Sequence, residues 1–198
     1  EYICSFFMLT ACRNFLTFDD LSLKTWLKKL LIFGLLWFCL WHVSIFLRIV
    51  SYIWYDPSST SFMEEQLAML QLEKPNIQKK QTWVPYSAIS KSVKRALIAA
   101  EDAKFLDHDG FDWDGIETAW EKNLAKGRIV AGGSTISQQL AKNLFLSSRR
   151  TPWRKAEEAL ITVMLEAVMD KRRIFEIYLN VIEWGDGVFG AESAARHY

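Results

Sequence analysis

A run of apolar residues from Leu30 to Val50, LLIFGLLWFCLWHVSIFLRIV, constrains this chain more than any other feature. It has the length that an α-helix needs to cross the hydrocarbon core of a bilayer, which is about 20 residues. Its basic interruptions are His42 and Arg48, and Arg48 lies near one end, where its long stem can reach the interface. We therefore interpret the run as a transmembrane helix.

The residues on either side of this run indicate its orientation. Lysines precede it and aromatic residues of an interfacial belt follow it, namely Lys24, Lys28, Lys29, Tyr52, Trp54 and Tyr55. The positive-inside rule then puts the N-terminus in the cytoplasm and everything after residue 55 outside it. A cleaved signal peptide and an amphipathic core helix are the alternatives, but the run is long for a signal peptide and no small-residue cleavage pattern follows.

Composition limits the class of protein further. A chain of 198 residues, of which 51% are hydrophobic, suits one ordinary domain with an accessory segment. A net charge of +1 carries no whole-chain signal for nucleic acid as a partner. Cys4, Cys12 and Cys39 all precede residue 40, so the rest has neither a disulfide framework nor a thiolate metal site. The first 20 residues carry no usable pattern.

Helical periodicity dominates the remainder, and no alternating strand pattern of consequence is present. A short helix at 62–72 and an extended piece at 83–86 are expected, followed by a glycine-rich turn at 185–190. Caps and apolar spacing predict further helices at 91–106, 113–127, 136–146, 153–170 and 172–182, and a helix start at 191–198. We expect a cytoplasmic segment 1–29, a transmembrane helix 30–50, a linker 51–80 and a mainly α-helical domain 81–198.

Ionisable residues are concentrated in EDAKFLDHDGF, residues 101–111, directly after the apolar run ALIAA. On a continuing helix, Glu101 lies one turn before Phe105 and two turns before His108, with Asp102 beside it. Such a group fits a divalent metal site or a general base. A solvated, capped helix end is the alternative.

A second stretch, GGSTISQQLAKN at 132–143, puts two glycines before a helix N-terminus. Free backbone N–H groups at such an end favour an anion, commonly a phosphate, although a well-capped polar helix has the same pattern. A run of basic residues that contains no acidic residue begins at the end of this stretch and comprises Lys142, Arg149, Arg150, Arg154 and Lys155. A phosphate or pyrophosphate partner accounts for both features.

The helix at 153–170 carries the second notable carboxylate, Glu158. It lies opposite a continuous apolar stripe formed by Ala156, Ala159, Leu160, Val163, Met164, Ala167 and Val168. Because Ile161 and Leu165 share the side of Glu158, we expect this carboxylate to line a cleft. Two glutamates around a cationic stretch suit glycosyl transfer, in which one carboxylate takes a proton from a sugar hydroxyl while cations stabilise a departing diphosphate.

These motifs resemble the glycosyltransferase family that polymerises peptidoglycan from lipid II, and within it the monofunctional biosynthetic peptidoglycan transglycosylases. Five ordered motifs carry the resemblance over residues 80–198: EDAKFLDHDG, GGSTISQQLAKN, RKAEE, KRRIFEIYLN and GAESAARHY. Ser137 stands where threonine is commoner, and Phe175 replaces leucine. The resemblance implies a helical, lysozyme-like fold.

The resemblance also implies roles for individual residues. Glu101 becomes the general base for the acceptor 4-hydroxyl, and Glu158 a second essential carboxylate near the donor's anomeric centre. The donor pyrophosphate and its groove fall to Ser134, Gln138, Gln139, Lys142, Asn143, Arg150, Arg154 and Lys155, supported by Asp102, Phe105, His108 and Gly110. Direct attack inverts an α-linked lipid diphosphate donor into a β-1,4 glycan and releases undecaprenyl diphosphate.

The implied setting is the bacterial inner membrane, which the chain crosses once, with the catalytic domain in the periplasm. The segment that contains Phe111, Trp113 and Trp120 corresponds to a region of the family near the membrane, where these aromatic residues meet the bilayer surface. The expected partners are lipid II, the growing glycan, the membrane, and cell-division or cell-wall synthases, without nucleic acid. The resemblance implies no required cofactor and allows a divalent cation, Mg or Mn, on the donor pyrophosphate. No dedicated metal cage is visible in the sequence. The N-terminal part of a bifunctional penicillin-binding protein, a lysozyme-like lytic enzyme and an inactive membrane-tethered scaffold are the alternatives.

Overall fold

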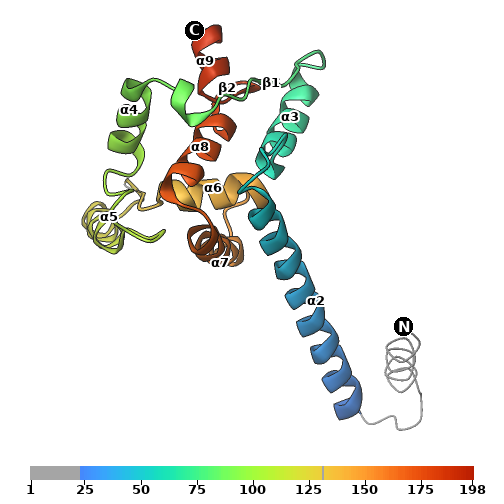
Figure 1. Ribbon diagram of the computed structural model, residues 1–198. Helices are drawn as coiled ribbons and strands as arrows, with labels where there is room; N and C mark the ends of the chain where they lie inside the picture. The colour runs from blue at the N-terminus through green and yellow to red at the C-terminus, as the bar shows by residue number, and fades with distance from the viewer. Residues whose placement is uncertain (1–22, 131) are drawn as a thin grey trace. The chain divides into compact units, whose positions relative to one another are not determined.

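The computed structural model describes residues 23–130 and 132–198 (Figure 1). Cys4, Cys12 and most of the predicted segment 1–29 lie outside the described residues. The chain divides into two compact units, the first ending at Ser44 and the second comprising Ile45–Tyr198. The predicted domain boundaries at residues 29, 50 and 80 stay predictions.

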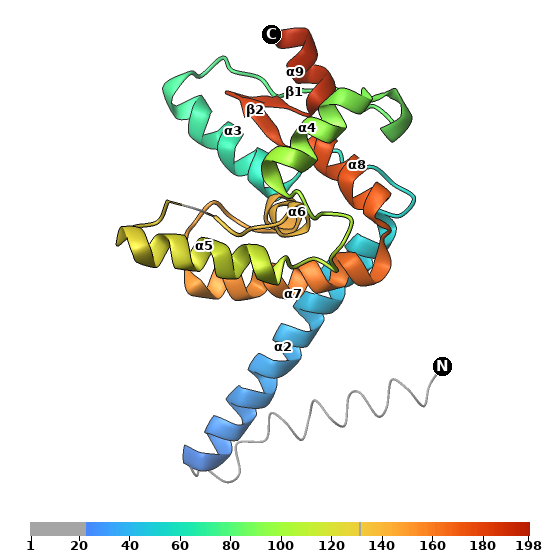
Figure 2. The ribbon, with the colours of Figure 1, turned by 90° about the vertical axis from the view of Figure 1, so that its left-hand side faces the viewer.

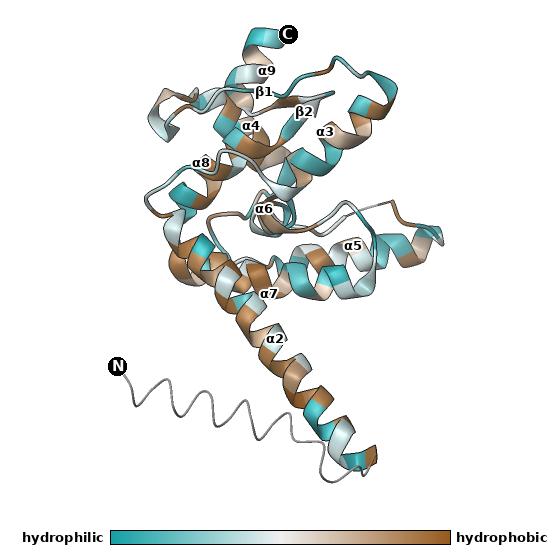
Figure 3. Ribbon diagram, turned by 90° about the vertical axis from the view of Figure 1, so that its right-hand side faces the viewer, coloured by the Kyte–Doolittle hydropathy of each residue, from teal (hydrophilic) through white to brown (hydrophobic). Residues whose placement is uncertain are grey.

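The first long element, α2 (Leu23–Ser51), contains the apolar run and is long and apolar enough to cross a membrane. Figure 3 shows its hydrophobic colouring over most of its length. Only its last turns belong to the second unit, where Ile45 and Ile49 are buried in the core. The helix is consistent with an N-terminal membrane anchor.

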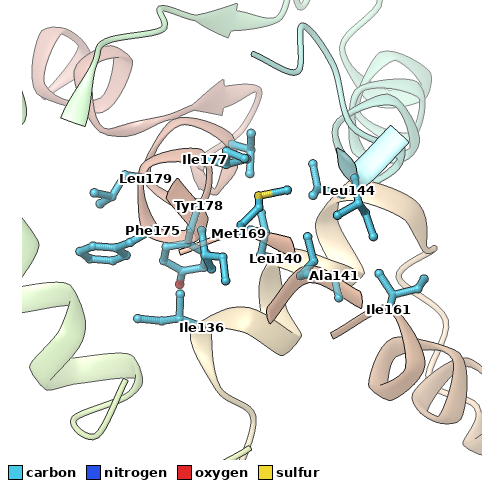
Figure 4. Packing of buried hydrophobic residues seen from close by; sticks show 14 of the residues in the cluster. Ile136, Leu140, Ala141, Leu144, Ile161, Met169, Phe175, Ile177, Tyr178 and Leu179 are labelled. Carbon is cyan, nitrogen blue, oxygen red and sulfur yellow. The ribbon is translucent and has the colours of Figure 1, made fainter. Parts of the chain in front are cut away.

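The second unit is mainly α-helical, as the sequence predicts. Its helices are α3 (Ser61–Glu73), α4 (Lys91–Glu101), α5 (Trp113–Lys126), α6 (Ile136–Phe145), α7 (Pro152–Val168), α8 (Lys171–Val181) and α9 (Ala191–His197). The central helix is α6, which packs against α3, α7 and α8. Leu140, Ala141 and Leu144 of α6 are fully buried, beside Ile161 of α7 and Phe175 of α8 (Figure 4). This core fixes the elements that carry the polar motifs.

A small sheet joins distant parts of the chain. Its strands are β1 (Lys80–Gln81), β2 (Glu183–Gly185) and β3 (Val188–Phe189), in the order β1-β3-β2. Strand β1 thus precedes the extended piece that was expected at 83–86. The expected glycine-rich turn is the turn of a β2–β3 hairpin, in which Gly187 has φ 70°. Strands of two or three residues are too short for an alternating pattern, so the sequence could not indicate them.

The helix predicted over 91–106 ends five residues early, at Glu101. Asp102 is extended, with φ −163°, and residues 103–109 form turns and bends. The predicted helical spacing of Glu101, Phe105 and His108 was therefore wrong. None of the residues of α4 is fully buried, and Ala96 and Ala100 are exposed, so the run ALIAA is not helix core throughout.

The buried face of α7 is the face of Glu158. Glu158, Ile161, Thr162 and Leu165 are buried there, against α6. In the apolar stripe, Leu160 is 37% and Val163 53% exposed, whereas Met164 and Val168 are partly buried against the core. A buried carboxylate is tolerable on the inner face because two cations pair with it.

Candidate active site

Glu101, the last residue of α4, is exposed and lines two cavities. The first has a volume of about 230 Å³ and is bounded by α4, the start of α5 and residues 132–135. The second, of about 380 Å³, is bounded by α3, α4, α6, α8 and β2. Gln139, Lys142 and Asn143 of α6, three of the residues expected to line the donor groove, line the second cavity together with Glu101.

A hydrogen-bonded chain orients the carboxylate of Glu101. The amide Nε2 of Gln139 donates to Glu101 Oε2 at 2.9 Å, and the hydroxyl of Tyr178 donates to Gln139 Oε1 at 3.0 Å. Burial raises the pKa of Tyr178, and the nearby charge of Glu101 adds to the rise, so this hydroxyl stays protonated as a donor. Gln139 is thus fixed at both ends of its amide.

Asp102 connects the end of α4 to the start of α6. Its side chain is only 2% exposed, and its oxygens lie 3.0 and 3.1 Å from His108 Nε2. The N–H of Gly110 donates to His108 Nδ1 at 3.1 Å, so Nε2 carries the proton. Asp102 Oδ2 also accepts from the N–H of Ile136 at 3.0 Å. The positive N-terminus of α6 stabilises this buried carboxylate.

Phe105 and Gly110, the other two residues expected to support the site, lie in the same part of the fold. Phe105 is fully buried in the core. Gly110 has φ 90°, and a Cβ there would lie 2.8 Å from Cγ2 of Thr162, so only glycine fits without displacement. The carbonyl of Gly110 accepts from the hydroxyl of Thr135 at 2.7 Å.

The N-terminus of α6 is already capped, contrary to the expectation of free N–H groups for an anion. Thr135 and Gln138 form a capping box, in which Thr135 Oγ1 accepts from Gln138 N–H and Gln138 Oε1 from Thr135 N–H. The N–H of Ile136 is occupied by Asp102. Gln138 is buried in this box and, among the described residues, is not one that lines either cavity at Glu101.

The cations divide into two groups. Lys142 lies in the larger cavity, with its Nζ 4.8 Å from the ring centroid of Phe62, and burial lowers its pKa. Arg154 donates to Glu158 Oε2 at 2.6 Å, while Lys155 pairs with Glu158 Oε1 and donates to Ser134 Oγ at 2.9 Å. Glu158 raises the pKa of Lys142 in opposition to its burial, so the two groups lie within electrostatic range.

Glu158 itself is almost completely buried, with its side chain 4% exposed. Within the described part of the chain, it is absent from the linings of both cavities at Glu101. Its two oxygens bind Arg154 and Lys155. Its direct contribution is therefore to the position of these cations. Arg150 is exposed in the loop before α7.

Sequence reasoning missed several residues of the larger cavity. Tyr178 belongs to a quoted motif, and its place three residues after Phe175 on α8 was the available signal for a buried side chain. Phe62, Glu183 and Trp184 lie outside the five motifs and reach the cavity from α3 and β2.

Asn143 Oδ1 is buried with no hydrogen-bond donor among the described residues. In the same residues, no group of three His, Cys, Asp or Glu side chains could hold a metal ion.

The fold and the site together define a helical domain in which the carboxylate of Glu101 and the ammonium of Lys142 line one cavity. The transglycosylase family model matches residues 66–198, and the chain belongs to the transglycosylase family. This family membership confirms the lysozyme-like helical fold and the enzyme class expected from the motifs.

Close relatives carry the name biosynthetic peptidoglycan transglycosylase. The protein of Laribacter hongkongensis is 73% identical over 161 residues, which cover 81% of this chain and 71% of that protein. That of Chromobacterium violaceum is 66% identical over 161 residues, with the same coverage of 81% and 71%. The Methylobacillus flagellatus protein is 62% identical over 168 residues, covering 85% of this chain and 73% of its own.

Proposed function

We propose that this chain is a peptidoglycan glycosyltransferase that polymerises lipid II into β-1,4-linked glycan strands for the bacterial cell wall. The family match and the names of the relatives support this class of reaction. The observation that carries the proposal is the setting of Glu101, which Gln139 holds in the cavity that also contains Lys142. A base and a cation facing one cavity suit attack by a hydroxyl on a lipid diphosphate donor.

Glu101 acts as the general base. Its carboxylate takes the proton of the acceptor 4-hydroxyl as that oxygen forms a bond to the donor's anomeric carbon. The bond from this carbon to the diphosphate oxygen breaks, undecaprenyl diphosphate leaves, and the α configuration becomes β. A positioned base contributes roughly 10²- to 10⁴-fold to such a step. The hydrogen bond from Gln139 keeps one oxygen of Glu101 fixed while the proton moves.

The cations stabilise the leaving diphosphate. Lys142 presents its ammonium group inside the cavity, and exposed Arg150 lies in the loop that leads to α7. Glu158 holds Arg154 and Lys155, so a buried carboxylate sets the direction of two cationic side chains. A Mg or Mn ion would neutralise further charge when it arrives bound to the donor diphosphate, and no resident cofactor is required.

The setting is the bacterial inner membrane. Helix α2 is the single-pass anchor, with the N-terminus in the cytoplasm and the catalytic domain in the periplasm. Trp113 and Trp120 of α5 are 70% and 65% exposed, which suits contact with the bilayer surface where a lipid-linked substrate resides. Cell-division or cell-wall synthases are the expected protein partners.

Polymerisation of lipid II by the detergent-solubilised chain tests the proposal. We expect glycan polymer from the chain as it stands and from Glu117→Gln, a control at an exposed glutamate of α5. Glu101→Gln should make at least about 100-fold less polymer, because it removes the base and keeps the shape. Absence of polymer from the unaltered chain, or hydrolysis of preformed glycan in its place, would contradict the proposal.

A further inference from the structure

The lining of the larger cavity contains a second carboxylate besides that of Glu101. Glu183, at the start of β2, lines the cavity of about 380 Å³ together with Glu101 and Lys142. It also lines a neighbouring cavity of about 300 Å³. Trp184 follows it and lines the larger cavity as well. Neither residue belongs to any of the five motifs, so no role follows for them from the motif pattern.

The hydrogen bonds of Glu183 come from neutral donors. Its Oε2 accepts from Gln66 Nε2 at 3.2 Å, and its Oε1 accepts from the N–H of Gly187 at 3.4 Å. Within the described part of the chain, none of the ion pairs includes Glu183. A carboxylate has about four lone-pair positions, so two donors leave acceptor capacity at the cavity.

This carboxylate is not required to shape the hairpin. The bond to Gly187 N–H is longer than the usual range for N–H···O bonds, about 2.7–3.2 Å. Gly187 adopts φ 70°, which glycine does without help from a side chain. Burial raises the pKa of Glu183, so the fold pays a cost for keeping it charged. A charge kept at a cost beside a catalytic cavity indicates a role in binding.

The chemistry of the cavity identifies the ligand group. A carboxylate repels a diphosphate, so the part of the substrate at Glu183 is not the diphosphate. It attracts O–H and N–H donors, and the indole of Trp184, 36% exposed, offers apolar surface beside it. A sugar has both an apolar face and a rim of donors. Figures 1 and 2 show α3 next to β2. Gln66 of α3 is not among the described residues that line the larger cavity, so it holds the carboxylate of Glu183 from outside that cavity.

We propose that Glu183 is a specificity-determining residue, which accepts a hydrogen bond from a hydroxyl or acetamido N–H of a hexosamine packed against Trp184. This inference rests on the proposed function, because the hexosamine is a sugar unit of lipid II or of the growing glycan. Gln66 is the positioning residue that orients the carboxylate. The interaction is made in both ground state and transition state, so it acts on substrate binding and not on the chemical step.

The test is the kinetics of lipid II polymerisation by the whole chain carrying Glu183→Gln. The new amide keeps an acceptor for Gly187, and the amide of Gln66 can rotate to accept from it. We expect a KM about tenfold higher, as for loss of a hydrogen bond to a charged group. The value of kcat should stay within about twofold, as for loss of uniform binding, and the melting temperature should not fall.

Two controls accompany this variant. Asp186→Asn removes a carboxylate of the same hairpin that, in the described structure, does not line the larger cavity, and its KM should match the unaltered chain. Gln66→Ala leaves Glu183 in place but frees one of its oxygens, and a KM about two- to threefold higher is expected. Gln66→Ala also carries the test if Glu183→Gln does not fold.

Substrate analogues identify the donor. The first analogue is lipid II with an acetoxy group in place of the acetamido group. If the acetamido N–H is the partner of Glu183, the KM for this analogue should be the same for Glu183→Gln and the unaltered chain. The second analogue is lipid II with a deoxy sugar, and the two KM values for it should be equal if a hydroxyl is the partner. A raised KM that persists with every such analogue assigns Glu183 to another part of the substrate and overturns the inference. An unchanged KM for lipid II in folded Glu183→Gln also overturns it, and if that variant does not fold, an unchanged KM for Gln66→Ala does so. If the unaltered chain forms no polymer, it is the proposed function that fails.

Discussion

Replacing Asp102 by asparagine should damage both the stability of the domain and the reaction, because this carboxylate holds the end of α4 to the start of α6. Its oxygens accept from His108 Nε2 at 3.0 and 3.1 Å and from Ile136 N–H at 3.0 Å. Both partners are donors, since Gly110 N–H fixes the proton of His108 on Nε2. An asparagine amide would turn an NH₂ group toward one of these two donors.

The magnitude follows from these contacts. A hydrogen bond to a charged acceptor contributes about 1.5–3 kcal/mol, and a buried donor left without a partner costs about 1–3 kcal/mol. The side chain is only 2% exposed, so water does not compensate. We expect a loss of about 3 kcal/mol in the free energy of unfolding, or roughly 6–12 °C in Tm for a domain of this size.

Thermal unfolding followed by circular dichroism, together with lipid II turnover well below both melting temperatures, measures the two effects separately. Because Glu101 directly precedes Asp102, we expect kcat to fall about 100-fold, as for a displacement of about 1 Å in a catalytic group. Asp114→Asn is the matched control, since its carboxylate is 82% exposed and pairs with Lys104 at the surface. Equal melting temperatures for Asp102→Asn and the unaltered chain would refute the structural role. Full kcat in a destabilised variant would refute the coupling to Glu101.

Three further outcomes follow from the site. Tyr178→Phe removes the hydroxyl that fixes Gln139, so we expect a loss of about 1 kcal/mol in stability and a lower kcat with little change in KM, measured by steady-state turnover. Burial lowers the pKa of Lys142 from its ordinary value of 10.5. As the pH rises, kcat/KM should therefore begin to fall before pH 10.5 is reached, because the ammonium loses its proton. Lys142→Arg should move this alkaline limb of the pH profile to higher pH. The same shift means that charged Lys142 costs stability at neutral pH, a cost that shrinks as pH rises through its folded pKa. Glu158→Gln leaves Arg154 and the half-exposed Lys155 without their carboxylate and should lower the free energy of unfolding by about 1–3 kcal/mol in urea titrations, because water partly solvates these cations.

Helix positions could be predicted where local chemistry decides them. Thr151 and Pro152 open α7 as cap and first-turn proline, and Gly127 ends α5 in the left-handed region with φ 59°. The end of α4 could not be predicted in this way. Its determinant is Asp102, whose partner Ile136 lies 34 positions further along the chain. A tertiary contact ended a helix that the periodicity of apolar residues would continue.

The inner face of α7 shows a second reason. Apolar spacing favoured the stripe that contains Leu160 and Val163 as the main hydrophobic face, yet the structure buries Glu158 and Thr162 on the opposite side. Met164 and Val168 of the same stripe are partly buried against the core, so α7 packs with more than one side. The most continuous apolar stripe of a helix therefore does not identify its most buried side by itself.

The cavity at Glu101 depends on one short helix for most of its geometry. Gln139 of α6 binds Glu101 and Tyr178, the N–H of Ile136 binds Asp102, and Lys142 lies over Phe62. The partners come from α3, α4 and α8, which are far apart in the sequence. The motif that contains α6 therefore combines two kinds of constraint. Its buried apolar residues fix the helix among α3, α7 and α8, and its polar residues can then hold a carboxylate and a cation in one cavity.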